Sequence, residues 1–337
     1  MKVAGYKLDL DPTVNELSER GYSLIGLHLP EGLKRYAKDI ASCLEKSTRA
    51  TIVIASDPCY GACDLADESF FSLGIEASVE VGHAAIPYLT QKIPTFFVNA
   101  TPTIDVCPVI GKAIRYLEGK RIGLVTTYQW AEKLGSIKKL LREEGLFPLT
   151  SKGDKRISSE GLVLGCNVSA AKRIEREVSS FLFIGEGDFH PVALLLSLDK
   201  PLIQADPISN RVRKEELIKL KEKIIKQRYQ AVDQAKDAET YGVLVSTKKG
   251  QQRIKLAREL KEKIGSHGKK AYIFMADELR PDKFDYLKGI DCLVSTCCPR
   301  VAIDDFLSYK LPIITPVELE MALGERKLER YKLDELI

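Results

Sequence analysis

Short runs of β-branched and other apolar residues alternate with longer amphipathic stretches along the whole chain. The first runs lie at residues 23–29, 50–55, 77–81 and 95–100. A short apolar run bounded by polar turns predicts a buried strand, whereas a longer stretch with apolar residues every three or four positions predicts a helix. Alternation of the two is typical of βαβ units. The pattern therefore predicts an α/β fold with mainly parallel sheets.

The same order of elements recurs twice further along the chain. The second series begins with RIGLVTT at residue 121 and continues through GLVLG, FLFIG and PLIQA. The third begins with YGVLVST at residue 241 and continues through AYIFM, CLVST and LPIIT. Recurrence at intervals of roughly a hundred residues is the size of a small domain, not of a solenoid repeat. We therefore expect three similar domains, each a mainly parallel four-stranded sheet flanked by helices.

The boundaries of these domains are expected in the stretches between the three series. We predict a first α/β domain at residues 1–117, a second at 118–208 and a third at 209–337. The Lys- and Glu-rich stretch at 213–236 alternates in charge like an exposed helix, and it would connect the second domain to the third.

Composition excludes several classes of protein. The chain has 45% hydrophobic and 29% charged residues, which fits a folded protein and not a disordered one. It contains no apolar segment long enough to span a bilayer, and its net charge of +4 gives little reason to expect direct contact with nucleic acid. The N-terminus lacks the basic-then-apolar order of a secretory signal. We therefore expect a cytoplasmic location, reduced cysteines and no contact with membranes.

Three of the eight cysteines occupy equivalent places in the three series. Cys59 follows TIVIASDP, Cys166 follows GLVLG, and Cys298 comes shortly after CLVST. Loops at the carboxyl ends of parallel strands form ligand sites, so three such loops could converge on one central point. A 4Fe-4S cluster held by three thiolates keeps one iron open to a substrate, whereas four thiolates close it. The positions predict a catalytic iron-sulfur site at the centre.

Cysteines can also bind zinc or pack as small apolar side chains. Cys63 and Cys297 could join Cys59 and Cys298 in a four-thiolate zinc site. Adjacent cysteines seldom ligate one tetrahedral ion, and such a site would leave the cysteine of GLVLGCN unexplained. The remaining cysteines are expected to be small apolar side chains without a metal: Cys43, Cys107 and Cys292.

Three further segments suggest substrate-binding residues. STKKGQQ follows the first strand of the third series and would place Ser246, Lys248 and Gln251 at the start of a helix, where free N–H groups favour a carboxylate. A plain helix cap explains this motif equally well. His190 follows the strand FLFIG, and Arg300 belongs to the TCCPR motif. The chain has neither a phosphate-binding loop of the Walker type nor a full dinucleotide-binding motif.

The three cysteine motifs together resemble a known family. DPCYGACD, GLVLGCN and TCCPR are similar to the cysteine motifs of the archaeal 2-(3-amino-3-carboxypropyl)histidine synthases, which catalyse the first step of diphthamide synthesis. The resemblance covers the whole chain. In the last motif the family's cysteine directly precedes Pro-Arg, which selects Cys298 over Cys297. The family's fold has three similar α/β domains around a 4Fe-4S cluster, and its archaeal members are homodimers.

The resemblance implies a transferase that uses radical chemistry. S-adenosylmethionine would bind the open iron, and reductive cleavage of its Cγ–S bond would release methylthioadenosine. The 3-amino-3-carboxypropyl group would pass to imidazole C2 of a histidine in translation elongation factor 2. The implied partners are this factor, a second copy of the chain and an electron donor of unknown identity. Two alternatives remain open: an iron-sulfur dehydratase like quinolinate synthase, and a non-catalytic, zinc-stabilised ligand-binding module.

Overall fold

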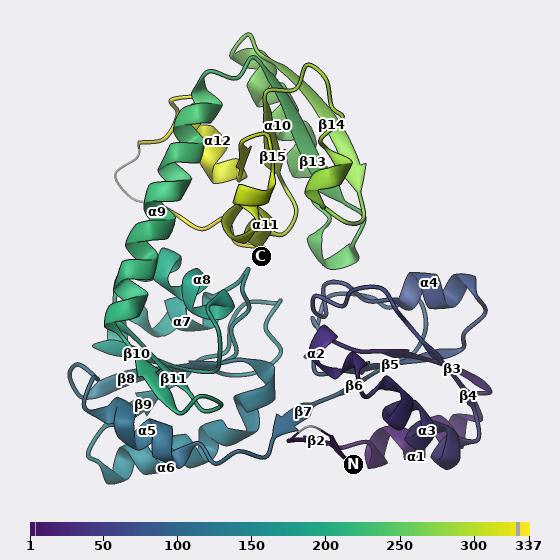
Figure 1. The fold of residues 1–337 in the computed structure, drawn as a ribbon. Coiled ribbons are helices and arrows are strands. Elements are labelled where there is room, and N and C mark those ends of the chain that lie inside the picture. Colours follow the sequence, from purple (N-terminus) through teal and green to yellow (C-terminus); the bar gives the residue numbers. More distant parts are fainter. Residues whose placement is uncertain (4, 328–330) are drawn as a thin grey trace.

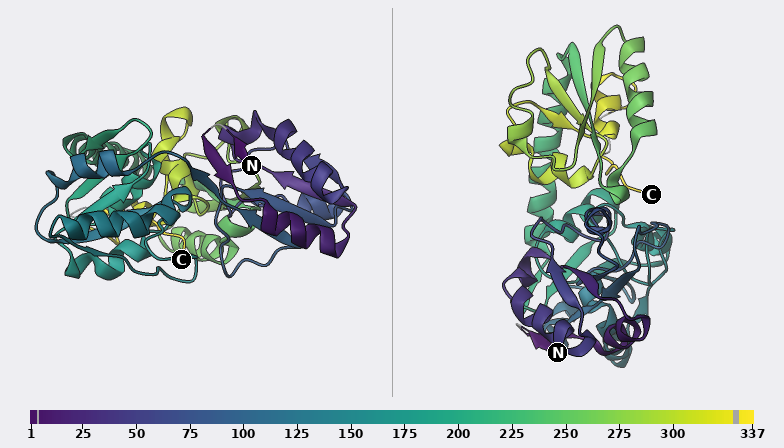
Figure 2. Two further views of the ribbon diagram at one scale, coloured as in Figure 1. Left: turned by 90° about the horizontal axis from the view of Figure 1, so that it is seen from below. Right: turned by 90° about the vertical axis from the view of Figure 1, so that its right-hand side faces the viewer.

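The computed structural model describes residues 1–3, 5–327 and 331–337, and it contains three mainly parallel sheets in three separate lobes. The lobes lie at the corners of a triangle and meet at its centre (Figure 1). Two further views show helices on the faces of the sheets (Figure 2). The predicted α/β fold, with several mainly parallel sheets flanked by helices, is confirmed.

The first lobe is built on a sheet with the strand order β4-β3-β5-β6, in which all pairs are parallel. Apolar residues fill the space between this sheet and its helices, since side chains such as Leu27 and Val79 are fully buried on neighbouring strands. The strands are β3 (Leu24–His28), β4 (Thr51–Ile54), β5 (Ala77–Val81) and β6 (Thr95–Val98). The helices are α1 (Asp11–Arg20), α2 (Glu31–Lys34), α3 (Ala37–Thr48) and α4 (Asp67–Ser72).

A small antiparallel sheet closes this lobe at the N-terminus. It joins β1 (Lys2–Val3), β2 (Tyr6–Leu8) and β7 (Ala100–Pro102) in the order β1-β2-β7. After β7 the chain passes into the second lobe.

The sheet of the second lobe has five strands, in the order β12-β11-β10-β8-β9, where the sequence pattern predicted four. Strand β12 is an antiparallel edge strand, and the other pairs are parallel. The strands are β8 (Arg121–Thr126), β9 (Phe147–Leu149), β10 (Ser180–Ile184), β11 (Leu202–Asp206) and β12 (Arg211–Arg213). The helices are α5 (Cys107–Ile114), α6 (Leu134–Glu143), α7 (Ser169–Ile174) and α8 (Phe189–Ser197), and the 3₁₀ turns are η1 (Tyr128–Lys133) and η2 (Glu175–Glu177).

One predicted strand of this lobe is not formed. GLVLG, at residues 161–165, makes only isolated bridges, pairing Leu162 with Thr126 and Leu164 with Asn167. Gly161, the first residue of the run, has a φ of +71°, a left-handed conformation that an extended strand does not adopt. The short β9 takes the edge position instead. Cys166 therefore lies in an irregular buried loop and not at the end of a strand.

The third lobe has a parallel sheet with the order β14-β13-β15-β16. Helix α9 (Glu215–Lys236) runs along one side of the molecule from the second lobe to the third (Figure 1). The strands are β13 (Thr240–Ser246), β14 (Lys270–Ala276), β15 (Cys292–Ser295) and β16 (Ile313–Ile314). The helices are α10 (Ile254–Ser266), α11 (Pro299–Asp304) and α12 (Pro316–Ala322), with 3₁₀ turns η3 (Lys249–Gln251), η4 (Pro281–Lys283) and η5 (Phe306–Ser308).

The C-terminal residues return to the second lobe. The N–H of Leu336 donates to the carbonyl of Cys166 at 3.0 Å, and the side-chain amide of Asn167 donates to the carbonyl of Leu336 at 2.8 Å. These two hydrogen bonds of Leu336 stabilise the loop that carries Cys166.

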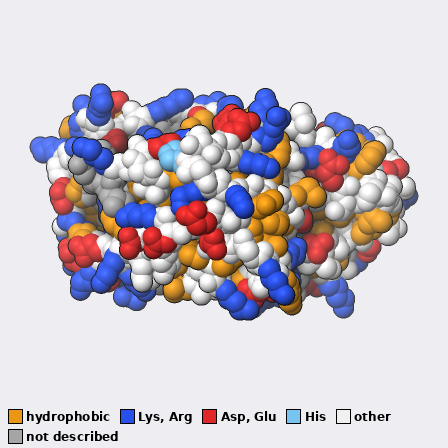
Figure 3. Space-filling model, turned by 90° about the horizontal axis from the view of Figure 1, so that it is seen from above, with side chains coloured by type: hydrophobic (Ala, Val, Ile, Leu, Met, Phe, Trp, Pro, Cys, Tyr) orange, Lys and Arg blue, Asp and Glu red, His pale blue; other side chains and the backbone are white. Residues whose placement is uncertain are grey.

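Two surface properties bear on partners. No helix in the described residues has the length and apolar character needed to cross a membrane. Seen from above, the surface of the molecule carries basic and acidic side chains interspersed with apolar ones (Figure 3). On the described part of that face, the mixture of signs differs from the uniform basic surface that binds a nucleic-acid backbone.

Candidate functional site

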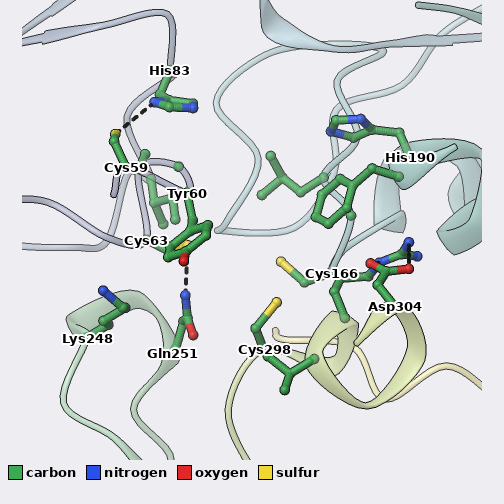
Figure 4. Close-up of a pocket in the computed structure, with 18 of the residues that line it drawn as sticks. Cys59, Tyr60, Cys63, His83, Cys166, His190, Lys248, Gln251, Cys298 and Asp304 are labelled. Carbon is green, nitrogen blue, oxygen red and sulfur yellow. Dashed lines mark hydrogen bonds and ion pairs between the residues drawn. The ribbon is translucent and has the colours of Figure 1, made fainter. Parts of the chain in front are cut away.

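A cavity of about 910 Å³ lies where the three lobes meet, and all three contribute to its walls (Figure 4). Its lining comes mostly from loops that follow strands of the three sheets, as the carboxyl ends of parallel strands are expected to provide. The volume suits a substrate of the size of a nucleoside conjugate. The main lining residues are 59–63, 82–86, 127–129, 162–166, 277–281, 298, 300 and 301.

Two of the predicted ligands, Cys166 and Cys298, lie next to each other at this cavity, and their sulfur atoms point to the same side (Figure 4). Cys298 is the N-cap residue of α11, and Cys166 lies in the GLVLGCN loop. Burial raises the pKa of the Cys166 thiol to about 11, although the guanidinium of Arg156 works in the opposite direction. Burial, followed by the nearby Cys166 and Cys63, raises the pKa of Cys298 well above its ordinary value.

Of the two cysteines in the motif of the first lobe, Cys63 lies nearer to this group, because its charge contributes to the raised pKa of both Cys166 and Cys298. The Sγ of Cys59 instead lies 3.6 Å from Nδ1 of His83, on the far side of the loop (Figure 4). Between the two cysteines, Gly61 has a φ of +154°, a conformation that turns the chain so that the two thiols face different ways.

The other possible partner, Cys297, faces away from the cavity. Its Sγ lies 3.4 Å from the carbonyl oxygen of Leu244, to which the thiol donates inside the third lobe. All the cysteines in the described residues are free of disulfides. The geometry therefore does not support the four-thiolate zinc site of Cys59, Cys63, Cys297 and Cys298.

The STKKGQQ loop of the third lobe holds Cys63 in place. The N–H of Gly250 donates to the carbonyl of Cys63 at 3.1 Å, and the side-chain amide of Gln251 lies 3.5 Å from the Cys63 sulfur. A Cβ atom at position 250 would come within 2.4 Å of the Cα of Cys63, so only glycine allows this approach. Gln251 thus lines the cavity, as predicted for a site residue, but its contact is with the thiol.

Lys248 was predicted to bind a substrate carboxylate, and its surroundings do not favour that role. Its ammonium group lies 2.6 Å from Asp64, 2.8 Å from Glu278 and 3.7 Å from Asp277. Three carboxylates more than balance one positive charge, so Lys248 joins the first lobe to the third and has little charge left for an anion. Ser246 is buried, and its Oγ accepts the backbone N–H of Lys248 at 3.1 Å. The loop therefore serves mainly to connect the two lobes.

Arg300 and His190 do face the cavity together. Nε and Nη2 of Arg300 donate to Asp304 at 2.8 and 2.6 Å, and the guanidinium stacks on the ring of Phe189 at 4.6 Å. Nη1 of Arg300 is buried and has no hydrogen-bond partner within the described part of the chain. Burial, followed by the charge of Arg300, lowers the pKa of His190 to about 3, so its imidazole is neutral. Arg300 thus offers a free donor to an anion.

A residue that the sequence did not single out, Arg156, lies beside the cysteines. It is only 2% exposed, and its guanidinium donates to the Tyr88 hydroxyl and the Gly250 carbonyl, each at 2.7 Å. Its Nε has no partner, and no carboxylate of the described residues forms an ion pair with it. A single arginine in a polar loop carries no sequence signal. Its location became evident only from the fold.

The charge of Arg156 indicates what the cavity holds. A buried charge without a counter-ion costs several kcal/mol, on the order of the stability of a whole domain. The acidic groups nearest to Arg156 are the thiols of Cys166 and Cys63 and the Tyr88 hydroxyl, and none of them is a carboxylate. An anionic group bound between the cysteines would balance this charge.

Comparisons with known proteins agree with the cysteine motifs. A family model described as "Putative diphthamide synthesis protein" matches residues 29–332. The chain is 33% identical over 326 residues to the 2-(3-amino-3-carboxypropyl)histidine synthase of Pyrococcus horikoshii, covering 96% of this chain and 92% of that protein. It is 27% identical to the enzyme of the same name from Methanocaldococcus jannaschii, covering 91% and 86%. The crystal structure of Dph2 from Pyrococcus horikoshii with a 4Fe-4S cluster superimposes with a TM-score of 0.89 at 32% identity, covering 98% of this chain and 94% of that one.

Proposed function

The chain belongs to the diphthamide synthesis family, and from this premise we propose how its cavity acts as a 2-(3-amino-3-carboxypropyl)histidine synthase. In this reaction the 3-amino-3-carboxypropyl group of S-adenosylmethionine is transferred to a histidine, and methylthioadenosine is released. One observation carries the proposal: thiols from three lobes face one cavity beside a buried arginine that has no carboxylate partner in the described part of the chain. Neither the dehydratase nor the zinc module accounts for this arrangement together with the family membership.

We propose that Cys63, Cys166 and Cys298 hold a 4Fe-4S cluster. The residues fit this group, because the thiols are free of disulfides and all contribute sulfur, the donor that iron-sulfur clusters use. Three thiolates make such a cluster anionic in both its oxidised and its reduced form, and Arg156 supplies the opposite charge. This assignment replaces Cys59, the residue expected from the sequence, by its neighbour in the same motif.

The cluster, when bound, supplies the electron that cleaves the Cγ–S bond and an open iron that can bind the substrate. The protein's own residues bind and orient the substrate. Arg300 would bind the methionine carboxylate through Nη1, the donor without a partner in the described residues. The neutral imidazole of His190 would act as a hydrogen-bonding group beside it. Apolar side chains such as Val163 and Ile86 line the cavity and would limit the access of water to the reacting carbon.

The partners follow from the same proposal. Translation elongation factor 2 would present its histidine at the open side of the cavity, where Tyr60 lines the wall and is 60% exposed. An electron donor would have to reach the same centre. We further propose that the protein works as a homodimer in the cytoplasm, since its protein substrate takes part in translation there.

An anaerobic assay tests the proposal directly. The protein is incubated with S-adenosylmethionine, a chemical reductant and elongation factor 2, and both the small molecules and the factor are analysed by mass spectrometry. We expect methylthioadenosine and a factor heavier by one 3-amino-3-carboxypropyl group. Release of 5′-deoxyadenosine without modification of the factor would contradict the proposal.

The ligand assignment has its own test in the pair of cysteines within one motif. We expect Cys63→Ser to lose cluster iron and sulfide together with activity, whereas Cys59→Ser keeps both iron and sulfide, because only Cys63 faces Cys166 and Cys298. Iron and sulfide analysis of the two anaerobically purified variants decides the matter. If Cys59→Ser lost the cluster and Cys63→Ser kept it, Cys59 would be the ligand after all.

A further inference from the structure

A second group of metal-binding side chains lies behind the wall of the cavity, inside the first lobe. Ligand atoms of His28, Cys59 and Glu80 all lie within 4.8 Å of one another, and all three residues are buried. Nδ1 of His28 is 2.8 Å from a carboxylate oxygen of Glu80. His28 ends β3, Glu80 lies near the end of β5, and Cys59 follows β4. Neighbouring parallel strands thus bring the three residues together at the carboxyl end of one sheet.

His83 lies next to this group, beside Cys59. Its Nδ1 lies 3.6 Å from the sulfur of Cys59, and both residues line the central cavity (Figure 4). A neutral imidazole has a lone pair on one ring nitrogen and can offer it to a metal ion. In a tetrahedral zinc site, with metal–ligand distances of about 2.0–2.3 Å, neighbouring ligand atoms lie roughly 3–4 Å apart. The observed separations of 2.8 and 3.6 Å are close to this range.

An unsatisfied carboxylate oxygen points independently to a ligand. Glu80 has no exposed surface, and its Oε1 has no hydrogen-bond partner among the residues that the structure describes. A buried carboxylate normally satisfies both oxygens, since an oxygen left alone loses its hydration without gaining a hydrogen bond. A His–Glu hydrogen bond serving only to stabilise the fold would use Oε2 and leave Oε1 unexplained.

We propose that His28, Cys59, Glu80 and His83 bind a single zinc ion, distinct from the iron-sulfur site. Two imidazole nitrogens, one thiolate and one carboxylate form a donor set that zinc accepts in tetrahedral geometry. The charges balance, because the two negative ligands neutralise the 2+ ion within a buried site. Binding displaces the thiol proton of Cys59 to solvent, and no electron is transferred.

The ion would anchor the loop that also carries the iron-sulfur ligand. Cys59 and Cys63 belong to one short loop, so the ion would fix Cys59 to the ends of β3 and β5, while Gly250 and Gln251 hold Cys63 independently. This inference rests on the assignment of Cys63 to the cluster, made under the proposed function. The zinc ion would act as a structural anchor. Of its four ligands, Cys59 and His83 line the cavity.

Element analysis tests the proposal on the full-length protein, purified anaerobically with its iron-sulfur cluster and dialysed against zinc chloride and then metal-free buffer. We expect about one zinc per chain in addition to the cluster iron. In Cys59→Ser and Glu80→Gln the zinc should fall at least tenfold while iron and sulfide stay unchanged. His28→Gln, which keeps a hydrogen-bond donor for Glu80, should lose zinc as well. Cys43→Ser on α3 and His267→Gln at the end of α10 are matched controls that should retain it.

Substitution of cobalt(II) for zinc gives a second measurement. We expect a thiolate-to-cobalt charge-transfer band that is present in the parent protein and in Cys63→Ser but absent in Cys59→Ser. Parent protein that retains no zinc after dialysis would overturn the proposal, as would zinc that persists in both Cys59→Ser and Glu80→Gln. Loss of iron together with zinc in Cys59→Ser, with iron retained in Cys63→Ser, would show that Cys59 belongs to the cluster instead.

Discussion

Two buried arginines, one in helix α9 and one beside the central cavity, differ in whether a carboxylate balances their positive charge. Arg228 of α9 is fully buried and donates to both carboxylate oxygens of Glu318 and to the carbonyl of Ile313, each at 2.7 Å. Arg156 is buried almost as completely, yet its acceptors are a hydroxyl and a carbonyl, neither of which carries a full charge.

The difference separates a structural region from a functional one. At the α9 site the protein's own residues balance the buried charge. The Tyr331 hydroxyl also donates to Glu318 at 2.8 Å, and Glu318 forms the capping box of α12 together with Thr315. The Arg156 site is complete only when an anionic group binds between the cysteines. A buried charge that the protein leaves unbalanced therefore indicates a ligand, whereas a balanced one indicates a fixed part of the fold.

The largest expected effect concerns the balanced site. Arg228→Met should lower the free energy of unfolding by about 3–5 kcal/mol, because it leaves Glu318 buried without its partner. Urea denaturation of the cluster-free protein measures this effect. The double variant Arg228→Met/Glu318→Leu should recover part of the loss, since no buried charge remains. A single variant as stable as the parent would contradict the account of α9.

The next effect concerns substrate binding at the cavity. Arg300→Gln should weaken the binding of S-adenosylmethionine by about 1.5–3 kcal/mol, the usual range for a hydrogen bond to a charged group. Lys248→Met is the matched control and should change binding much less, because carboxylates already surround that ammonium group. Anaerobic calorimetric titration compares the two variants. Equal weakening in both would mean that Lys248 contacts the substrate despite its ion pairs.

The smallest expected effect is a gain in stability, and it tests the comparison of the two arginines most directly. In cluster-free protein, Arg156→Met should raise the free energy of unfolding by about 1 kcal/mol or more, because it removes an unbalanced buried charge. The same variant should retain less iron after reconstitution, since the bound anionic group loses its counter-ion. Thermal unfolding of cluster-free protein and iron analysis after gel filtration provide the two measurements. A loss of stability similar to that of Arg228→Met would show that Arg156 is structural.

Much of the fold followed from local pattern. Strands such as β8 and β13 were predicted because apolar runs of strand length are bounded by polar turns, and backbone geometry then makes a buried strand the favourable state. The GLVLG run had the same pattern but made only isolated bridges, and it begins at Gly161 in a left-handed conformation. Its apolar residues are buried all the same, with Leu162 and Val163 at most 1% exposed. Pattern thus predicts burial more reliably than it predicts backbone pairing.

The sequence by itself determined the α/β class, the three series of elements and the presence of one cysteine motif in each. Only the tertiary structure decided which thiol of CYGAC faces the centre, because that depends on the turn at Gly61 and on the approach of Gly250 from another lobe. Only the tertiary structure also decided which buried charges are balanced. Asp64, 184 residues away in the sequence, balances Lys248, while no carboxylate of the described residues pairs with Arg156. Local periodicity fixes secondary structure, but the balance of buried charge depends on contacts between segments that are distant in the chain.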